Sequence, residues 1–141
     1  MSSTILVDAG PLVAYFDRDA DQHQWMREQA ARLPPGWLTS EAVLGETAHL
    51  LRRAGVAPEQ LLALVAGELL RVPFHLEEEV ETLRRLLRRY RDRPMSLADA
   101  TLVRLSELYE NCQVLTLDSD FTIYRRFDRR PIPVLMPPGK T

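Results

Sequence analysis

The chain has 141 residues, of which 45% are apolar and 27% charged, and its formal net charge is −2. These values are those of an ordinary soluble protein, and they predict one domain over residues 1–141 that buries a single core. The molecule is not a polycation, which disfavours an electrostatic coat for nucleic acid but leaves a local basic patch possible. Cys112 is the sole cysteine, so an intrachain disulfide and a cysteine-based zinc site are excluded.

Other features restrict the location and the kind of metal site. The three histidines are scattered without the spacing of metal ligands, so we do not expect a histidine-rich site. The first ten residues lack the charged head and long apolar stretch of a signal peptide. The most apolar window, LLALVAGELL, is too short to span a membrane and contains Glu68. We therefore expect a cytoplasmic protein that makes no use of a membrane.

Strands and helices alternate along the first half of the chain. The apolar run Thr4–Val7 predicts a strand that stops at Asp8, and Gly10-Pro11 then opens a helix with proline at an early position. The next elements are a helix over Gln22–Leu33, a strand over Trp37–Thr39, a helix that Ser40 caps and that runs to about Arg53, a helix from Pro58 through Ala66 and a strand over Leu69–Val72.

The second half continues the alternation. It predicts a charged helix over Leu76–Tyr90, a helix capped by Ser96 from Leu97 to about Glu110, a strand over Gln113–Leu117, a short helix from Asp118 or Ser119 to Arg126, a strand over Pro133–Met136 and a loose tail over residues 137–141. This order predicts an α/β fold, in which helices cover both faces of a parallel sheet. Strands that are almost continuously apolar, such as VLTL, fit burial on both sides.

Four acidic residues lie where a predicted strand or helix begins or ends, or beside an apolar helix stripe: Asp8, Glu46, Asp99 and Asp118. Each has an ordinary explanation, because aspartate is a favoured helix cap and Glu46 can be a solvated side chain. Together the four are harder to explain, because carboxylates with apolar neighbours are costly unless something pairs with them. Ligands of open α/β sheets bind outside the carboxyl ends of the strands, where Asp8 and Asp118 lie. A hard divalent cation is a natural partner for such oxygens.

Four motifs in this order resemble a PIN domain: ILVDAGPLVAYF, the helix that opens with TSEAVLGE, LADA at a helix start, and LTLDSDF. In length and layout the chain is close to the VapC-type toxins of bacterial toxin–antitoxin pairs, from Ile5 to about Val134. The resemblance implies a three-layer α/β/α sandwich with a central parallel sheet of four to five strands. It also implies a ribonuclease dependent on Mg²⁺ or Mn²⁺, with RNA as substrate, a small antitoxin as partner and a homodimer as the assembly.

The resemblance also implies roles for single residues. Asp8, Asp99 and Asp118 would be metal ligands, and Glu46 would orient the attacking water or complete the shell. Together these four acids would be the catalytic set. Secondary positions match Thr116, the hydroxyl residue before the last acid, and Asp120, an extra acid. Glu41 competes with Glu46, but it lies too near the start of its helix to match the family position.

Basic charge is carried almost wholly by arginine, in two groups. The first group, LRRLLRRYRDR, is interpreted as a solvated helix face on which Glu81 pairs with Arg85, with a phosphate-contacting rim as the alternative. The second group follows Asp118 closely and consists of Arg125, Arg126, Arg129 and Arg130. It is the better candidate for guiding RNA to the acids. From it we select Arg125 and Arg126 as candidate substrate-binding residues.

Other functions remain open as alternatives. A PIN-like module that binds RNA or protein without catalysis would keep the same residues. A metal-dependent phosphatase of the haloacid dehalogenase type also begins with an apolar strand ending in aspartate, but it requires a second aspartate at position 10, where this chain has Gly10. A receiver-like signalling domain would need a lysine near the last strands, and the sole lysine is Lys140.

Overall fold

The structure is a computed structural model and describes residues 3–139. A parallel sheet forms its centre. Within these residues the sheet has five strands in the order β3-β2-β1-β4-β7, and every neighbouring pair is parallel. The strands are β1 (Thr4–Val7), β2 (Trp37–Leu38), β3 (Leu70–Arg71), β4 (Cys112–Leu115) and β7 (Val134–Leu135). The predicted parallel sheet of four to five strands is confirmed.

The two longest strands, β1 and β4, lie side by side in the middle of the sheet. Their register pairs Val7 with Leu115, and the peptide N–H of Asp8 donates to the Leu115 carbonyl at 3.0 Å. Leu6, Val7 and Leu115 are completely buried, because helices cover both faces of the sheet at this point. The residues that follow β1 and β4 therefore emerge next to each other at one edge.

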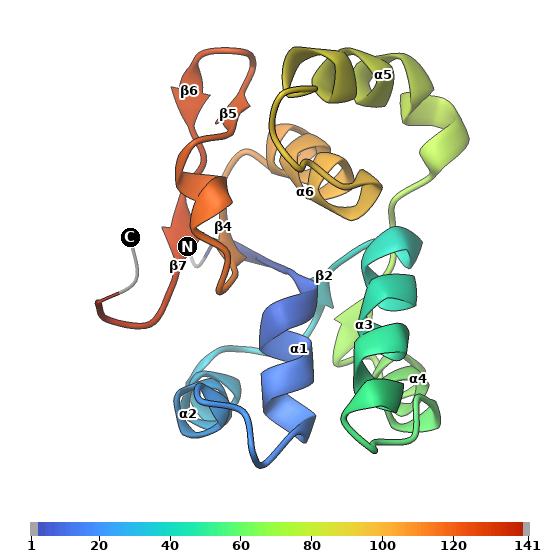
Figure 1. The fold of residues 1–141 in the computed structure, drawn as a ribbon, viewed down its shortest axis with the longest axis vertical. Helices are drawn as coiled ribbons and strands as arrows, with labels where there is room; N and C mark the ends of the chain where they lie inside the picture. The colour runs from blue at the N-terminus through green and yellow to red at the C-terminus, as the bar shows by residue number, and fades with distance from the viewer. Residues whose placement is uncertain (1–2, 140–141) are drawn as a thin grey trace.

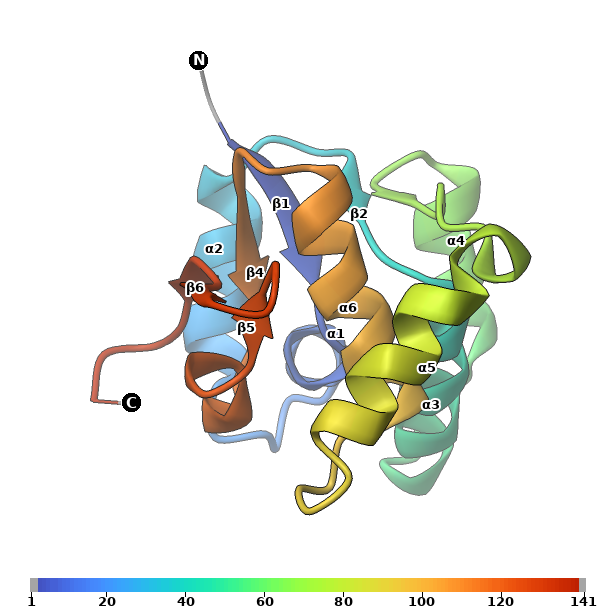
Figure 2. The same cartoon turned by 90° about the horizontal axis from the view of Figure 1, so that it is seen from above.

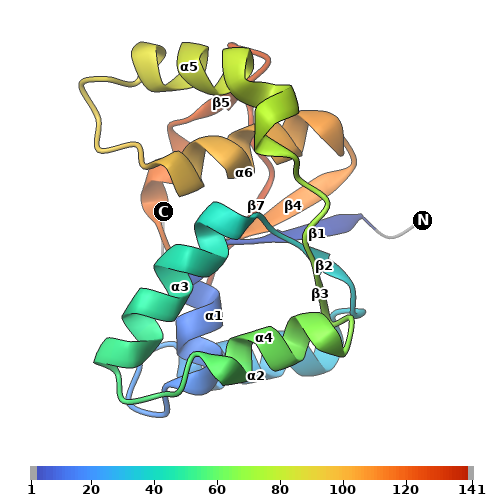
Figure 3. The ribbon, with the colours of Figure 1, turned by 90° about the vertical axis from the view of Figure 1, so that its right-hand side faces the viewer.

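Helices pack on both faces of the sheet (Figures 1 and 3). On one face lie α6 and, outside it, α5; on the other lie α1, α2 and α4. Helix α3 lies on the side of α1 but also packs against α6. Their bounds are α1 (Ala9–Phe16), α2 (His23–Arg32), α3 (Glu41–Arg53), α4 (Glu59–Ala66), α5 (Val80–Arg89) and α6 (Leu97–Leu108). The arrangement is the predicted three-layer sandwich.

Helix α6 is the most buried helix of the sandwich. Ser96 caps it, and the Asp99 carboxylate returns a hydrogen bond to the Ser96 N–H, so a capping box closes the first turn. Every residue from Ala98 through Glu107 except Arg104 is buried. Seen from above, α6 lies between α5 and the strands β1 and β4 (Figure 2). Asp99 in its first turn is thus buried, although Ser96 and Leu97 beside it are exposed.

The region after β4 differs from the prediction of a short helix to Arg126. A single 3₁₀ turn, η2 (Ser119–Thr122), is followed by a small antiparallel hairpin of β5 (Arg125–Arg126) and β6 (Arg130–Pro131). Phe127 and Asp128, in the loop between them, have φ of 54° and 63°, a left-handed backbone that no helix contains. The predicted helix is wrong beyond Thr122, because Arg125 and Arg126 form a strand that pairs with β6.

Two smaller differences occur elsewhere. The predicted helix over Leu76–Tyr90 begins as a 3₁₀ turn, η1 (Leu76–Glu79), before α5. Pro137 is buried, so the predicted loose tail is wrong at its first residue, while residues 140–141 lie outside the described part of the chain. None of the helices within residues 3–139 is both long and apolar enough to cross a lipid bilayer.

Candidate active site

The carboxyl ends of β1 and β4 bring Asp8 and Thr116 together. Asp8 is the N-cap of α1 and accepts the Ala9 N–H with Oδ1, while its Oδ2 accepts the Thr116 hydroxyl at 2.8 Å. The same hydroxyl oxygen accepts the Asp118 N–H at 3.0 Å. Thr116 therefore links two of the predicted acids across the sheet edge, and its secondary role in catalysis stays a prediction.

The third acid, Asp99, lies in the first turn of α6 and is buried. Its Oδ2 accepts the Ser96 N–H at 3.1 Å and the Tyr124 hydroxyl at 3.3 Å. The capping interpretation of Asp99 is thus correct locally. Capping occupies only one of its two oxygens, however, so it does not exclude a ligand on the other.

Glu46, the fourth acid, lies on α3. Hydrogen bonds at the same sheet edge fix this helix: Thr39 Oγ1 donates to the Val7 carbonyl at 2.9 Å, and the hydroxyls of Ser40 and Thr101 are 2.7 Å apart. The second of these bonds joins the start of α3 to α6. Glu46 is the most exposed of the four acids, whereas Glu41 lies exposed at the first position of the helix.

The pKa values of these acids show that they share one region. Burial raises the pKa of Asp8 to about 6, although the Thr116 and Ala9 donors oppose the shift, and the charges of Asp99 and Glu46 add to it. Burial also raises the pKa of Asp99, with the Asp118 charge adding to the shift. The pKa of Glu46 is raised by partial burial and then by the charges of Asp99 and Asp118. Asp8, Asp99 and Glu46 are therefore near enough for their charges to act on one another, and the charge of Asp118 acts on Asp99 and Glu46.

Among residues 3–139, no arginine or histidine lies within ion-pair distance of Asp8, Glu46, Asp99 or Asp118. Carboxylate oxygens with raised pKa values and no protein cation suit a hard divalent ion in their chemistry. In this conformation the side chains of the described residues are not gathered tightly around one point, since no three of them form a metal-binding group.

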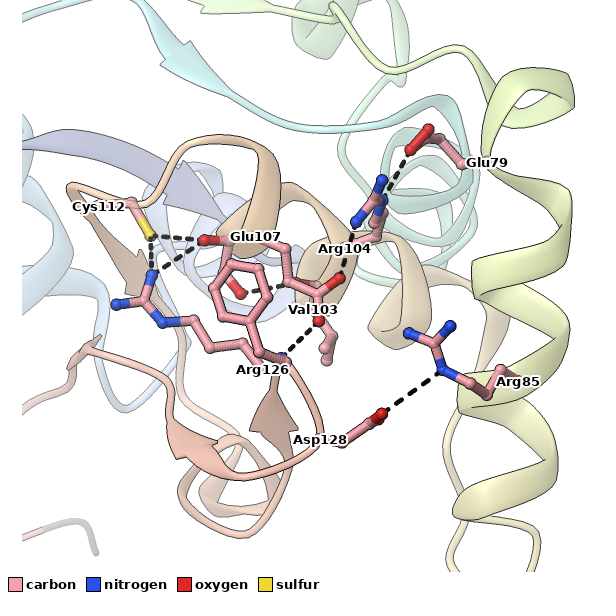
Figure 4. A network of polar contacts seen from close by, with 10 residues as sticks. Glu79, Arg85, Val103, Arg104, Glu107, Cys112, Arg126 and Asp128 are labelled. Atoms are coloured by element: carbon pink, nitrogen blue, oxygen red, sulfur yellow. Dashed lines mark hydrogen bonds and ion pairs between the residues drawn. The ribbon is translucent and has the colours of Figure 1, made fainter.

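Of the two arginines predicted to bind substrate, Arg126 is buried. Its guanidinium donates to the carbonyls of Ser106 and Glu110 at 2.9 and 2.8 Å. It also lies 3.9 Å from the sulfur of Cys112 (Figure 4). The prediction for Arg126 is therefore wrong, because the hairpin turns this side chain toward the end of α6. Arg125 is only partly buried, and its guanidinium donates to the carbonyls at the end of η2, including those of Thr122 and Tyr124.

A different arginine lies beside the acids. Arg93, in the loop before α6, forms an ion pair with Asp120 at 3.6 Å. The Asp120 N–H in turn donates to Asp118 Oδ1 at 2.9 Å. The carboxylate of Asp120 thus faces Arg93, and its secondary role at the site stays a prediction. On α5, Glu81 pairs with Arg84 rather than with Arg85 as predicted, and Arg85 and Arg89 are paired with Asp128.

Two residues at the site were missed from the sequence, Arg93 and Tyr124. Arg93 was one arginine among six in a charged run, and nothing in the run distinguishes it from its neighbours. Tyr124 follows Asp118 by six residues in an apolar segment. From the sequence, a tyrosine at the site cannot be distinguished there from an ordinary core tyrosine. Only the contacts with Asp120 and Asp99 identify them.

Comparison with known proteins identifies the family. The family profile described as PIN domain matches residues 5–126. The chain belongs to the PIN domain family. It is 29% identical over 116 residues to Ribonuclease VapC26 of Mycobacterium tuberculosis, covering 81% of this chain and 86% of that protein. It also superposes on the crystal structure of M. tuberculosis VapC20, a sarcin-ricin loop cleaving toxin, with a TM-score of 0.74, 26% identity and coverage of 91% of this chain and all of that one. The predicted resemblance to VapC-type PIN domains is confirmed.

Proposed function

We propose that this PIN domain protein is an endoribonuclease toxin of the VapC type, which hydrolyses RNA phosphodiester bonds with Mg²⁺ or Mn²⁺. The observation that carries the proposal is the group of four acids at the carboxyl edge of the sheet, with which no arginine or histidine of residues 3–139 forms an ion pair. A charge of this kind is unfavourable for folding alone, so it indicates a ligand. Similarity to two RNA-cleaving VapC proteins supports RNA as the substrate class.

Asp8, Asp99 and Asp118 would hold the metal ion. When bound, the ion supplies a water of lowered pKa and neutralises charge on the phosphate oxygens. The protein's own contribution is to fix the acids, as Thr116 does by bonding to Asp8 Oδ2 and to the Asp118 N–H. This network restricts Asp8 and the loop of Asp118 before any substrate arrives.

Glu46 suits proton transfer. Its carboxylate is exposed and accepts no hydrogen bond from the described residues, and its raised pKa favours taking up a proton. In the proposed reaction Glu46 takes a proton from the attacking water, the water oxygen bonds to phosphorus, and the bond to the leaving ribose oxygen breaks. The leaving oxygen is then protonated from solvent.

The partners follow from the same proposal. Arg93 lies at the rim beside Asp120 and is better placed than Arg126 to meet a phosphate of the RNA. A small protein antitoxin, a homodimeric assembly and a cytoplasmic location are expected of a VapC-type toxin and are part of the proposal.

The test is cleavage of a mixed RNA pool by the wild type and by Asp8→Asn, in Mg²⁺ or Mn²⁺ and in a chelator. We expect metal-dependent cleavage that falls in Asp8→Asn by at least roughly 100-fold, the scale of losing one preorganised electrostatic group. Asp128→Asn is the matched control, because this aspartate pairs with Arg85 and Arg89 away from the acids.

Each other outcome has a definite meaning. Full activity of Asp8→Asn in metal-containing buffer would exclude this site. RNA binding by the wild type without cleavage would favour the non-catalytic binding module. Hydrolysis of a small phosphomonoester, with RNA left intact, would favour the phosphatase.

A further inference from the structure

Tyr124 is a completely buried tyrosine whose hydroxyl ends at the acidic group. Its ring is packed edge to face between Tyr90 and Phe121, with ring centroids 5.1 and 5.3 Å away. Its N–H donates to the Asp120 carbonyl at 3.0 Å, so backbone and ring are both held. From this fixed position the hydroxyl donates to Asp99 Oδ2 at 3.3 Å. The ring is core, but its polar end is directed at a site residue.

The hydroxyl can act only as a donor to Asp99. A carboxylate oxygen only accepts hydrogen bonds, so the phenol O–H is the donor in this contact. The Ser96 N–H donates to the same oxygen, Oδ2. Neither of these two hydrogen bonds involves Oδ1 of Asp99. The two donors thus fix the carboxylate through one oxygen and leave the other available.

The arrangement repeats what Thr116 does for Asp8. Each of the two buried acids receives one side-chain hydroxyl, at 2.8 Å for Asp8 and 3.3 Å for Asp99. In each case the donor comes from the chain segment around Asp118: Thr116 lies two residues before it and Tyr124 six residues after it. The segment that carries the third acid therefore also orients the first two.

We propose that Tyr124 is a positioning residue of this active site, which holds the Asp99 carboxylate in the orientation that binds the metal ion. The inference rests on the proposed function, because it assigns Tyr124 a role toward the ion that Asp8, Asp99 and Asp118 would hold. It goes further in naming a residue that contributes no ligand atom and still sets metal affinity.

The experiment compares Tyr124→Phe with Tyr90→Phe. Each variant loses one hydroxyl and keeps its ring, and the Tyr90 hydroxyl accepts the Arg125 N–H instead of contacting an acid. Mn²⁺ binding to each protein is measured by calorimetry without RNA, and thermal unfolding is measured in a chelator. We expect Tyr124→Phe to bind Mn²⁺ about 10-fold more weakly than the wild type, and Tyr90→Phe to bind it equally well. Unfolding temperatures of the two variants in chelator should be alike.

Cleavage gives a second readout. The Mn²⁺ concentration that gives half of full activity should rise about 10-fold in Tyr124→Phe, while kcat at saturating Mn²⁺ returns toward the wild-type value. Equal Mn²⁺ affinity of the two variants, with an active wild type, would overturn the role of Tyr124 alone. Weaker binding accompanied by a clearly lower unfolding temperature than that of Tyr90→Phe would assign the hydroxyl to the core and overturn it as well. A wild type that binds no Mn²⁺ would overturn the proposed function itself, and this inference with it.

Discussion

The buried acids of residues 3–139 fall into two groups that are compensated in opposite ways. Beneath the β5–β6 hairpin, the Glu107 side chain accepts from Arg104 at 3.0 Å and from the Phe127 N–H at 2.6 Å, and Arg104 also meets Glu79 at 2.7 Å (Figure 4). At the sheet edge, Asp8 and Asp99 are as deeply buried but receive only neutral donors. Both groups contain buried acids, but only the acids of the Glu107 group are paired with an arginine.

The difference shows which charge serves folding and which serves a ligand. The Glu107 network joins the hairpin to α6 and to the turn before α5, and its acids are matched by arginine. The acids of the sheet edge repel one another and would stabilise the fold if neutralised. Function, rather than stability, explains such an arrangement.

The largest effect that separates the two groups is the pH dependence of the metal-free protein. The pKa of Asp8 is about 6 in the folded protein and 3.8 when unfolded, so the folded state binds this proton more tightly. The resulting stability is fully present below pH 3.8 and is lost as the pH rises through about 6. The loss at neutral pH is on the order of 3 kcal/mol, and Asp99 and Glu46 act in the same direction.

The measurement is urea unfolding in a chelator at several pH values, for the wild type and for Asp8→Asn. Because the amide carries no charge, Asp8→Asn should be more stable than the wild type at pH 7, and the gap should close near pH 4. Parallel stability curves for the two proteins would contradict the assignment of the raised pKa to Asp8. Adding Mg²⁺ should stabilise the wild type more than the variant.

The same chemical change in the other group should have the opposite sign. Glu107→Gln leaves Arg104 with Glu79 alone and weakens a paired site whose carboxylate is almost fully buried. We expect the free energy of unfolding to fall by roughly 1–3 kcal/mol, less than for a fully buried pair that loses its only partner. RNA cleavage per folded molecule should stay at the wild-type level. A Glu107→Gln protein as stable as the wild type would remove the contrast between the two groups.

The sequence predicted the sheet and the acids for the same reason. Apolar runs such as Thr4–Val7 specify buried strands, and parallel topology then places the residues after β1 and β4 at one edge. Periodicity could not show that Glu46 reaches that edge, because this depends on the contact of α3 with α6 through Ser40 and Thr101. The family resemblance supplied that residue.

What was missed depends on contacts with little local signal. Strands of two residues, such as β5 and β6, have no measurable periodicity, and the left-handed backbone at Phe127 is unusual for a bulky residue. Arginine is usually a surface residue, yet the guanidinium of Arg126 is buried against the carbonyls of Ser106 and Glu110. Its Nε is the only buried side-chain polar atom of the described residues that lacks a hydrogen-bond partner. The contact of Tyr124 with Asp99 likewise has no signal in the local sequence.

The smallest expected effect concerns the arginine at the border of the acidic group. Arg93 is 42% exposed and pairs loosely with Asp120, at 3.6 Å, so it can turn from this carboxylate to an RNA phosphate at little cost. Arg93→Gln should raise KM for RNA by roughly 3- to 10-fold, leave kcat unchanged and lower the dependence of binding on salt concentration by about one phosphate contact.

Arg84→Gln is the matched control, since Arg84 is an exposed arginine paired with Glu81 on α5. Equal KM values for the two variants would show that charge near the acids has no special role and that RNA is held elsewhere. A higher KM in Arg93→Gln alone would place the path of the RNA along the loop before α6. Arg93 would then release the Asp120 carboxylate in order to bind an RNA phosphate, whereas the Glu107 network keeps its pairs and holds the fold.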